Sequence, residues 1–230
     1  MPRIKPCSQT CDMTRNLALA LALCVIAPTT LTGCATAAYN IQERFGIEKR
    51  DILVSRVESV VKSQTEAKEE FADALEAFRA VVAVDAGELE TVYDDLSRAH
   101  DRAKGQAGEV RDRVSSVKRV AEDLFNEWER ELGAYSDAGL RRSSERQLRD
   151  TQQKYAALTD KMDAATASMD PVLAVFNDRV LYLKHNLNAR AISALGNETT
   201  DIESDVARLI AEMERSISAA DAFIKDMNGV

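Results

Sequence analysis

Residues 53–81 read LVSRVESVVKSQTEAKEEFADALEAFRAV, and this stretch decides the fold. Apolar or small residues recur in it at alternating steps of four and three, the heptad pattern of a helix that packs lengthwise on other helices. The positions on this seam are Leu53, Val57, Val60, Gln64, Ala67, Phe71, Ala74, Phe78 and Val81. Polar and charged residues fill most positions between them, so the stretch predicts a long amphipathic helix.

The same pattern returns three more times along the chain. Asp85-Ala86-Gly87 interrupts the first series, a turn falls at residues 133–139, and Gly196-Asn197 closes the third series. We expect helices near residues 41–84, 88–132, 140–195 and 199–227, about 66, 68, 84 and 44 Å long at 1.5 Å per residue. The third series runs through Leu187, and the fourth passes through Ile217, Ala220 and Ile224. Pro171 lies inside the third series, and we favour a kinked but continuous helix there over an N-cap at Asp170 and a new helix.

These elements predict an all-α fold, an elongated antiparallel bundle of three long helices and one shorter helix. Short connections make successive helices antiparallel neighbours. We expect a single rod-shaped domain over residues 43–230, with three helices in the half nearest the N-terminus. The fourth helix would complete a four-helix section at the far end. Because three helices leave one face uncovered, self-association or a protein partner on that face is expected.

Composition supports this fold class and excludes others. The chain has 230 residues with only 9 Gly and 4 Pro, too little turn chemistry for a fold of many strands. Its net charge is −8, so nucleic acid and bulk anionic lipid would be repelled over most of the surface.

The N-terminal segment has the pattern of a cleaved secretion signal. Residues 17–27 read LALALALCVIA, follow Arg15, and are too short to span a bilayer, which needs about 20 residues. Leu31-Thr32-Gly33-Cys34 resembles the bacterial lipobox, in which the cysteine is acylated. We therefore expect a signal peptide at 1–33, with Met13 as an alternative start, and a lipidated tether at 34–42. A buried helix that happens to end in Gly-Cys is the alternative.

Lipidation of Cys34 predicts membrane attachment of an otherwise acidic protein. Cleavage leaves 197 residues with 27 basic and 37 acidic groups, and Cys34 becomes the sole cysteine, so no intramolecular disulfide can form. A multiply acylated cysteine is a stable anchor. Ala35 follows it where an inner-membrane retention signal typically has Asp, so the expected location is the cell envelope, at the periplasmic face of the outer membrane.

Motifs for catalysis are not found in the sequence. Gly105-Gln106-Ala107-Gly108 lacks the spacing and the lysine of a phosphate-binding loop, so no nucleotide is expected. His100 and His185 each lack the glutamate three residues earlier that bundle metal sites use, and we expect both at the surface or its boundary. We predict no cofactor, no metal site and no enzymatic activity.

Four arginines gather at the start of the third helix: Arg141, Arg142, Arg146 and Arg149. Cations are unfavourable at a helix N-terminus, so another interaction should keep them there. One interpretation is pairing with Glu127, Glu129 and Glu131 on the preceding helix. The other is a site for lipid phosphate or an acidic partner at the membrane-proximal turn.

A second unusual run reads LYLKHNLNAR at residues 181–190. Polar residues crowd one and a half turns of it, where Leu183 and Leu187 keep the seam. The candidate interaction residues are Tyr182, Lys184, His185, Asn186 and Asn188. They would form either a polar patch that fixes helix register or a docking surface for a partner.

Several of these segments together resemble a family of bacterial envelope proteins known as domain of unknown function 2959. The matching segments are Gly139–Ser144, Met169–Leu173, Leu181–Ala189 and Asp205-Val206. The resemblance implies a secreted helical protein and supplies no catalytic residue. The function we expect is that of a non-enzymatic lipoprotein whose rod acts as a structural or adaptor module. A lipid-binding or membrane-shaping protein that uses the arginines is the alternative, and a hydrolase is the least favoured.

Overall fold

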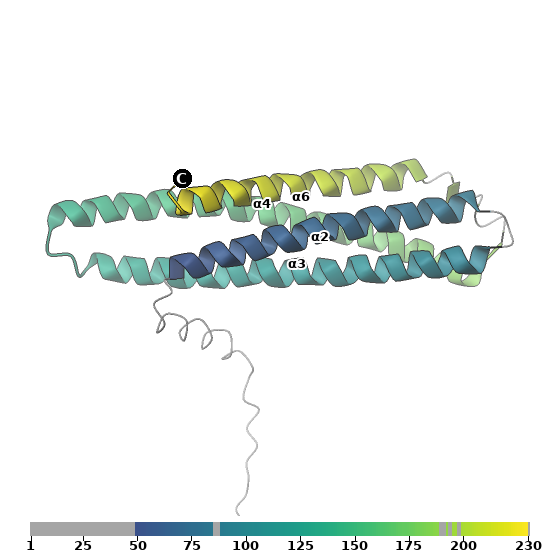
Figure 1. Cartoon of the computed structure of the whole chain (residues 1–230), viewed down its shortest axis with the longest axis horizontal. Helices are drawn as coiled ribbons and strands as arrows, with labels where there is room; N and C mark the ends of the chain where they lie inside the picture. Colours follow the sequence, from purple (N-terminus) through teal and green to yellow (C-terminus); the bar gives the residue numbers. More distant parts are fainter. Residues whose placement is uncertain (1–48, 85–87, 189–191, 193–194, 197–198, 230) are drawn as a thin grey trace, which may run out of the picture.

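Four long helices form the part of the chain that the structure describes, and they run antiparallel in sequence order (Figure 1). A computed structural model describes residues 49–84, 88–188, 192, 195–196 and 199–229. The helices are α2 (Lys49–Ala83), α3 (Leu89–Leu132), α4 (Ala138–His185) and α6 (Thr199–Met227). No strand occurs within these ranges, and the predicted all-α bundle is confirmed. The expected signal peptide, tether and residues 43–48 lie outside them.

The helices are arranged as a ring in which each contacts the helix before and after it, and α6 closes the ring against α2. Cross-helix ion pairs mark every contact. They are Arg102–Glu70 between α3 and α2, Lys118–Asp163 between α3 and α4, Lys154–Asp226 between α4 and α6, and Arg79–Glu203 between α2 and α6. Such exposed pairs each contribute about 0–1 kcal/mol, so they orient the helices more than they stabilise them.

Stability comes from the seam that the heptad pattern predicts. All nine predicted seam positions of α2, from Leu53 to Val81, are buried. Phe71, Phe78 and Phe176 are fully buried in the same core, which runs the length of the bundle. Burial of such side chains, at roughly 1.5–3 kcal/mol each, is the main favourable contribution to folding.

The third helix is shorter at its C-terminal end than predicted. α4 passes through Pro171 without interruption, as expected, but it ends at His185 and not near residue 195. Asn186 is the C-cap residue, and its side-chain amide donates to the carbonyl of Tyr182 at 2.9 Å. Asparagine competes with the helix backbone in this way. Leu187 is therefore 38 % exposed, and the expected continuation of the seam through it is wrong.

The final helix follows the predicted seam except at two positions near its C-terminal end, and the buried seam residues are Ile202, Val206, Leu209, Met213 and Ala220. α6 buries Ser216, Ala220, Phe223 and Met227, whereas Ile217 and Ile224 are only partly buried. The predicted three-helix half is also wrong. α6 extends back along α2, so all four helices meet near Arg50.

Among the described residues, two helices alone form the end of the molecule at which α2 begins. The last residues of α3, the turn, and the first residues of α4 extend past the start of α2 and the end of α6 (Figure 1). We call residues 129–146 the overhanging hairpin. No residue in it is buried. At its base, the Trp128 indole donates to the hydroxyl of Ser144 at 2.8 Å, and Gln152 donates to Glu129 at 3.1 Å.

The turn of this hairpin depends on one capping side chain. The carboxylate of Asp137 accepts from the backbone N–H groups of Gly139 and Leu140, both at 2.7 Å. A Cβ on Gly139 would lie 3.0 Å from that carboxylate oxygen, so glycine suits the position.

Replacing the cap should loosen the first turn of α4. We expect Asp137→Ala to cost about 1 kcal/mol locally, because two backbone donors lose their acceptor. Amide hydrogen exchange over residues 138–146, measured by mass spectrometry, should become faster by roughly fivefold. Asp137→Asn is the control, since it keeps an acceptor oxygen. Unchanged exchange in Asp137→Ala would contradict the capping role.

Candidate interaction surfaces at the two ends of the bundle

The four predicted arginines lie on and just beyond the α4 arm of the overhanging hairpin, and all are exposed. Arg142, Arg146 and Arg149 are spaced by four and three residues, so they share one face of the helix. Buried Leu148 and hydrogen-bonded Ser144 occupy the opposite face. The structure therefore turns three guanidinium groups away from the bundle, toward solvent.

The predicted pairing of these arginines with the preceding helix is wrong. Glu127 bonds Lys49 at 2.9 Å, and Glu129 accepts from Gln152. Arg141 pairs within its own helix, with Glu145 at 3.0 Å. The side chains of Arg142, Arg146 and Arg149 make no ion pair with any residue that the structure describes.

Two large apolar side chains accompany the arginines on the overhanging hairpin. Tyr135 in the turn is 42 % exposed, and Leu140 in the first turn of α4 is 62 % exposed. Sequence reasoning missed Tyr135, because a tyrosine in a turn has no periodicity to mark it. The structure shows that Tyr135 lies beyond the ends of α2 and α6, and that its hydroxyl donates to the Ser144 hydroxyl at 3.5 Å while the ring remains partly exposed.

The second predicted cluster lies at the opposite end of the bundle. Leu181, Tyr182 and Leu187 are 50 %, 41 % and 38 % exposed, and we call these three residues the far-end patch. Lys184, His185 and Asn188 beside it are exposed and Asn186 is half-buried, whereas Leu183 points into the core. The polar residues therefore do not form a register-fixing layer inside the bundle.

The structure keeps the two clusters apart. Arg149 and Tyr182 are separated by 33 positions of one helix, which corresponds to about 50 Å. They cannot form one site, and each must be considered as a separate surface. Cys34, the predicted lipidation site, lies outside the described residues.

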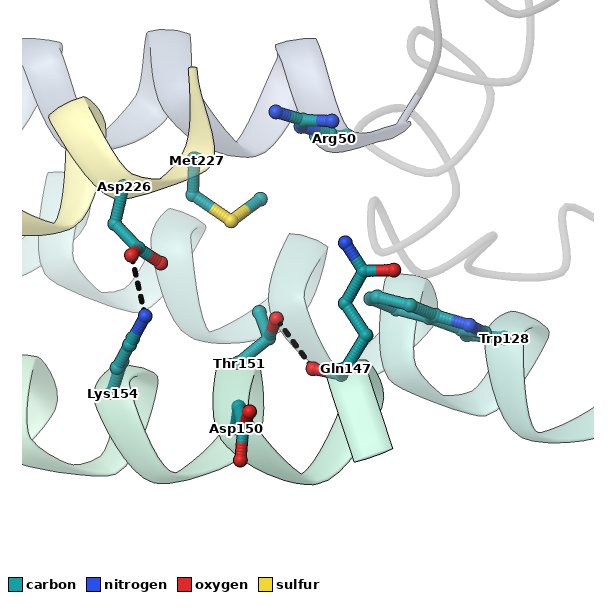
Figure 2. A pocket seen from close by; sticks show the side chains of 8 residues that line it. All are labelled: Arg50, Trp128, Gln147, Asp150, Thr151, Lys154, Asp226 and Met227. Carbon is teal, nitrogen blue, oxygen red and sulfur yellow. Dashed lines mark hydrogen bonds and ion pairs between the residues drawn. The ribbon is translucent and has the colours of Figure 1, made fainter. Parts of the chain in front are cut away.

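An open pocket of about 210 Å³ lies at the base of the overhanging hairpin, where the four helices meet (Figure 2). Lys154 pairs with Asp226 across it, and the Thr151 hydroxyl donates to the backbone oxygen of Gln147 at 2.9 Å. Its other lining residues are Arg50, Trp128, Asp150 and Met227. Most polar groups here are thus engaged within the protein, and the pocket marks the end of the core. A shallower apolar groove of about 380 Å³ runs between α4 and α6, beside Ala219 and Phe223.

Next to this pocket, three aromatic rings link α3, α4 and α6. Tyr155 lies edge-to-face between Phe125, at a centroid distance of 5.3 Å, and Phe223, at 6.4 Å. Burial, together with the negative charges of Asp163 and Glu122, raises the pKa of Tyr155 to about 12.

This shift predicts a loss of stability at alkaline pH. The unfolded phenol ionises near pH 10 and the folded phenol near 12, so the unfolded state releases its proton first and the free energy of unfolding falls across that window. Between these pH values we expect the free energy of unfolding of the wild type to fall by about 1–2 kcal/mol more than that of Tyr155→Phe. This value allows for solvent screening around a half-buried ring. Urea unfolding at pH 9 and pH 12 measures it. Tyr182→Phe controls for loss of an exposed hydroxyl, and identical pH curves for wild type and Tyr155→Phe would contradict the assignment.

The two histidines differ from each other. His185 is exposed as expected, but His100 is 6 % exposed, so its expected surface position is wrong. Its Nδ1 lies 3.4 Å from a carboxylate oxygen of Asp101. Within the described ranges, no three His, Cys, Asp or Glu side chains are grouped so that they can hold a metal ion. Nor does any helix in those ranges combine the length and apolar character needed to cross a membrane.

The architecture defines an elongated all-α bundle with a candidate interaction surface at each of its two ends. A profile of the family described as Protein of unknown function (DUF2959) matches residues 38–227, which is most of the chain. The chain belongs to this family. Comparisons with curated proteins and with solved structures gave no match.

Proposed function

We propose that this protein is a non-enzymatic lipoprotein of the bacterial cell envelope, whose rod holds a protein partner at a fixed distance from the membrane. One observation carries the proposal. The chain enters the bundle at Lys49, at one end, and the exposed apolar far-end patch lies at the other. At 1.5 Å per residue, α2 alone separates the two ends by about 50 Å.

The far-end patch has the composition of a docking surface. Aromatic and large aliphatic side chains are favoured at the centres of protein interfaces, and polar residues surround them. Tyr182 and Leu181 supply the apolar part, and Lys184 and His185 supply the polar rim. The partner we expect is therefore an envelope protein with an apolar, partly acidic surface.

Anchoring is tested at Cys34. The native protein should carry an acyl-modified Cys34 by mass spectrometry and partition into detergent, and Cys34→Ser should be soluble and unmodified. An unmodified wild-type protein in the soluble fraction would refute the lipoprotein assignment.

Docking is tested by photo-cross-linking in cells that make the acylated protein. A photoreactive residue replaces Tyr182, and the matched control replaces Ser115, an exposed residue in the middle of α3. We expect one specific protein to be captured at position 182 and not at 115, with capture lost in a Leu181→Asp background. Only intrachain or self cross-links at position 182 would refute the adaptor function.

A second candidate function is binding of lipid phosphate by the arginines of α4. The observation that favours it is that Arg142, Arg146 and Arg149 face solvent without an ion pair in the described part of the chain. A hydrolase is the least favoured function, and turnover in a broad substrate screen that His185→Ala abolishes would support it.

A further inference from the structure

The overhanging hairpin presents charge and apolar surface in the order that a membrane interface requires. Its most exposed apolar side chains, Leu140 and Tyr135, lie at and next to the turn. Arg142, Arg146 and Arg149 follow along α4, on the face turned away from the core. Interfacial protein segments place apolar groups at the acyl boundary and cations at the level of the phosphates.

Local charge differs from the charge of the whole protein. Residues 138–149 contain four arginines and one glutamate, a net charge of +3 on a chain whose total is −8. Exposed charges are screened beyond about 8 Å at physiological salt, so the acidic four-helix section adds little repulsion at the end of the hairpin. Over the whole hairpin, residues 129–146, four basic and four acidic groups balance, so the net positive charge is confined to the α4 arm. Asp137 in the turn is bonded to the backbone N–H groups that begin α4.

The position of the hairpin beside the start of α2 indicates that a membrane is what this surface contacts. The Lys49–Glu127 ion pair places the start of α2 beside the base of the overhanging hairpin, and Cys34 precedes Lys49 by fifteen positions. An extended chain of that length spans at most about 50 Å. If Cys34 is acylated, as proposed above, the hairpin lies at the membrane end of the rod. The charge and apolar argument for lipid contact does not depend on acylation.

We propose that the overhanging hairpin is a membrane-contact surface for anionic phospholipid, in which Leu140 and Tyr135 enter the headgroup region and Arg142, Arg146 and Arg149 bind lipid phosphates. Guanidinium groups suit this role because they bond phosphate oxygens in pairs. The contact would hold the rod upright on the surface to which its N-terminus is tethered.

The test uses unacylated protein, so that it is independent of the proposed anchor. Residues 34–230 with Cys34→Ser retain every described residue and are mixed with vesicles of phosphatidylglycerol and phosphatidylethanolamine at 1:1, in roughly 50 mM salt. Arg142→Glu/Arg146→Glu is compared with Lys104→Glu/Arg119→Glu, which makes the same charge change at exposed residues of the four-helix section that have no ion pair there. Circular dichroism confirms that both variants remain folded.

We expect the Arg142/Arg146 variant to bind at least tenfold more weakly than the parent, and the Lys104/Arg119 variant to bind within twofold of it. Leu140→Ser should weaken binding about threefold without changing its salt dependence. Absence of binding by the parent protein, or equal losses in the two double variants, would overturn the proposal. Displacement by inorganic phosphate beyond that by sodium chloride of equal ionic strength would also overturn it, in favour of a discrete phosphate site. If the vesicles are not bound but Cys34 is acylated, the lipid-contact proposal is overturned and the lipoprotein proposal stands. If the vesicles are bound but Cys34 is not acylated, the lipoprotein proposal is overturned and the lipid-contact proposal stands.

Discussion

Phe176→Ala is expected to lower the free energy of unfolding by about 3–5 kcal/mol, the largest loss we predict for a single substitution. Phe176 is fully buried in α4, among side chains from the surrounding helices. Truncation removes most of its apolar contact and leaves a cavity, because four helices held by lengthwise contacts cannot collapse at one point. Urea unfolding followed by fluorescence of Trp128, the single tryptophan, measures the effect.

Leu181→Ala is the matched control for that experiment. Leu181 lies on the same helix and is 50 % exposed, so its truncation should change stability by less than about 0.5 kcal/mol. A loss at position 176 as small as that at position 181 would contradict the placement of Phe176 in the core.

Gln64→Leu is expected to stabilise the protein by about 2 kcal/mol. Gln64 is fully buried on the α2 seam, and neither its amide nitrogen nor its amide oxygen has a hydrogen-bond partner among the described residues. Each buried unsatisfied group costs about 1–3 kcal/mol, and leucine fits the position without that cost. Thermal unfolding should rise by roughly 4–8 °C for a protein of this size.

Gln106→Leu provides the opposite case with the same chemical change. The Gln106 amide on α3 donates to the backbone oxygen of Ser63 and to Glu66, both at 3.1 Å. Its replacement should cost about 1 kcal/mol, because those acceptors lose a partner. A loss of stability in Gln64→Leu would contradict the assignment of Gln64 as unsatisfied.

Sequence periodicity predicted the core well where a helix has neighbours along its whole length. Every expected seam position of α2 is buried, because a step of four and three places residues on one face whatever the partner helix is. In α6 the two adjacent stripes are both apolar. Packing against the other helices buries Phe223 and leaves Ile224 partly exposed, and the spacing of apolar residues cannot predict which of the two is buried.

The end of α4 shows where local chemistry overrides periodicity. Leu187 continues the spacing, yet the Asn186 side chain bonds the backbone and the helix stops at His185. The expected helix to residue 195 followed the apolar spacing and neglected this competition.

The sequence identified the residues of the two candidate surfaces but did not predict that their side chains are exposed. The arginines and the Leu181–Asn188 run were identifiable because their composition departs from that of the other helices. Their exposure was not, since it depends on where α2 and α6 end relative to α3 and α4. The internal pairing expected for the arginines is wrong because Lys49 and Gln152 bond Glu127 and Glu129.

The ring order of the helices also bears on how the protein folds. Among the four described helices, three of the four main contacts join helices that follow one another in the sequence, and these can form as local hairpins soon after synthesis. The contact of α6 with α2 joins the two ends of the described chain, and its Lys68–Glu214 pair is 146 positions apart. This contact therefore has the largest entropic cost of loop closure. The nascent chain therefore exposes the apolar face of α2 until the last helix leaves the ribosome, and the risk of misassembly between two copies is concentrated in that interval.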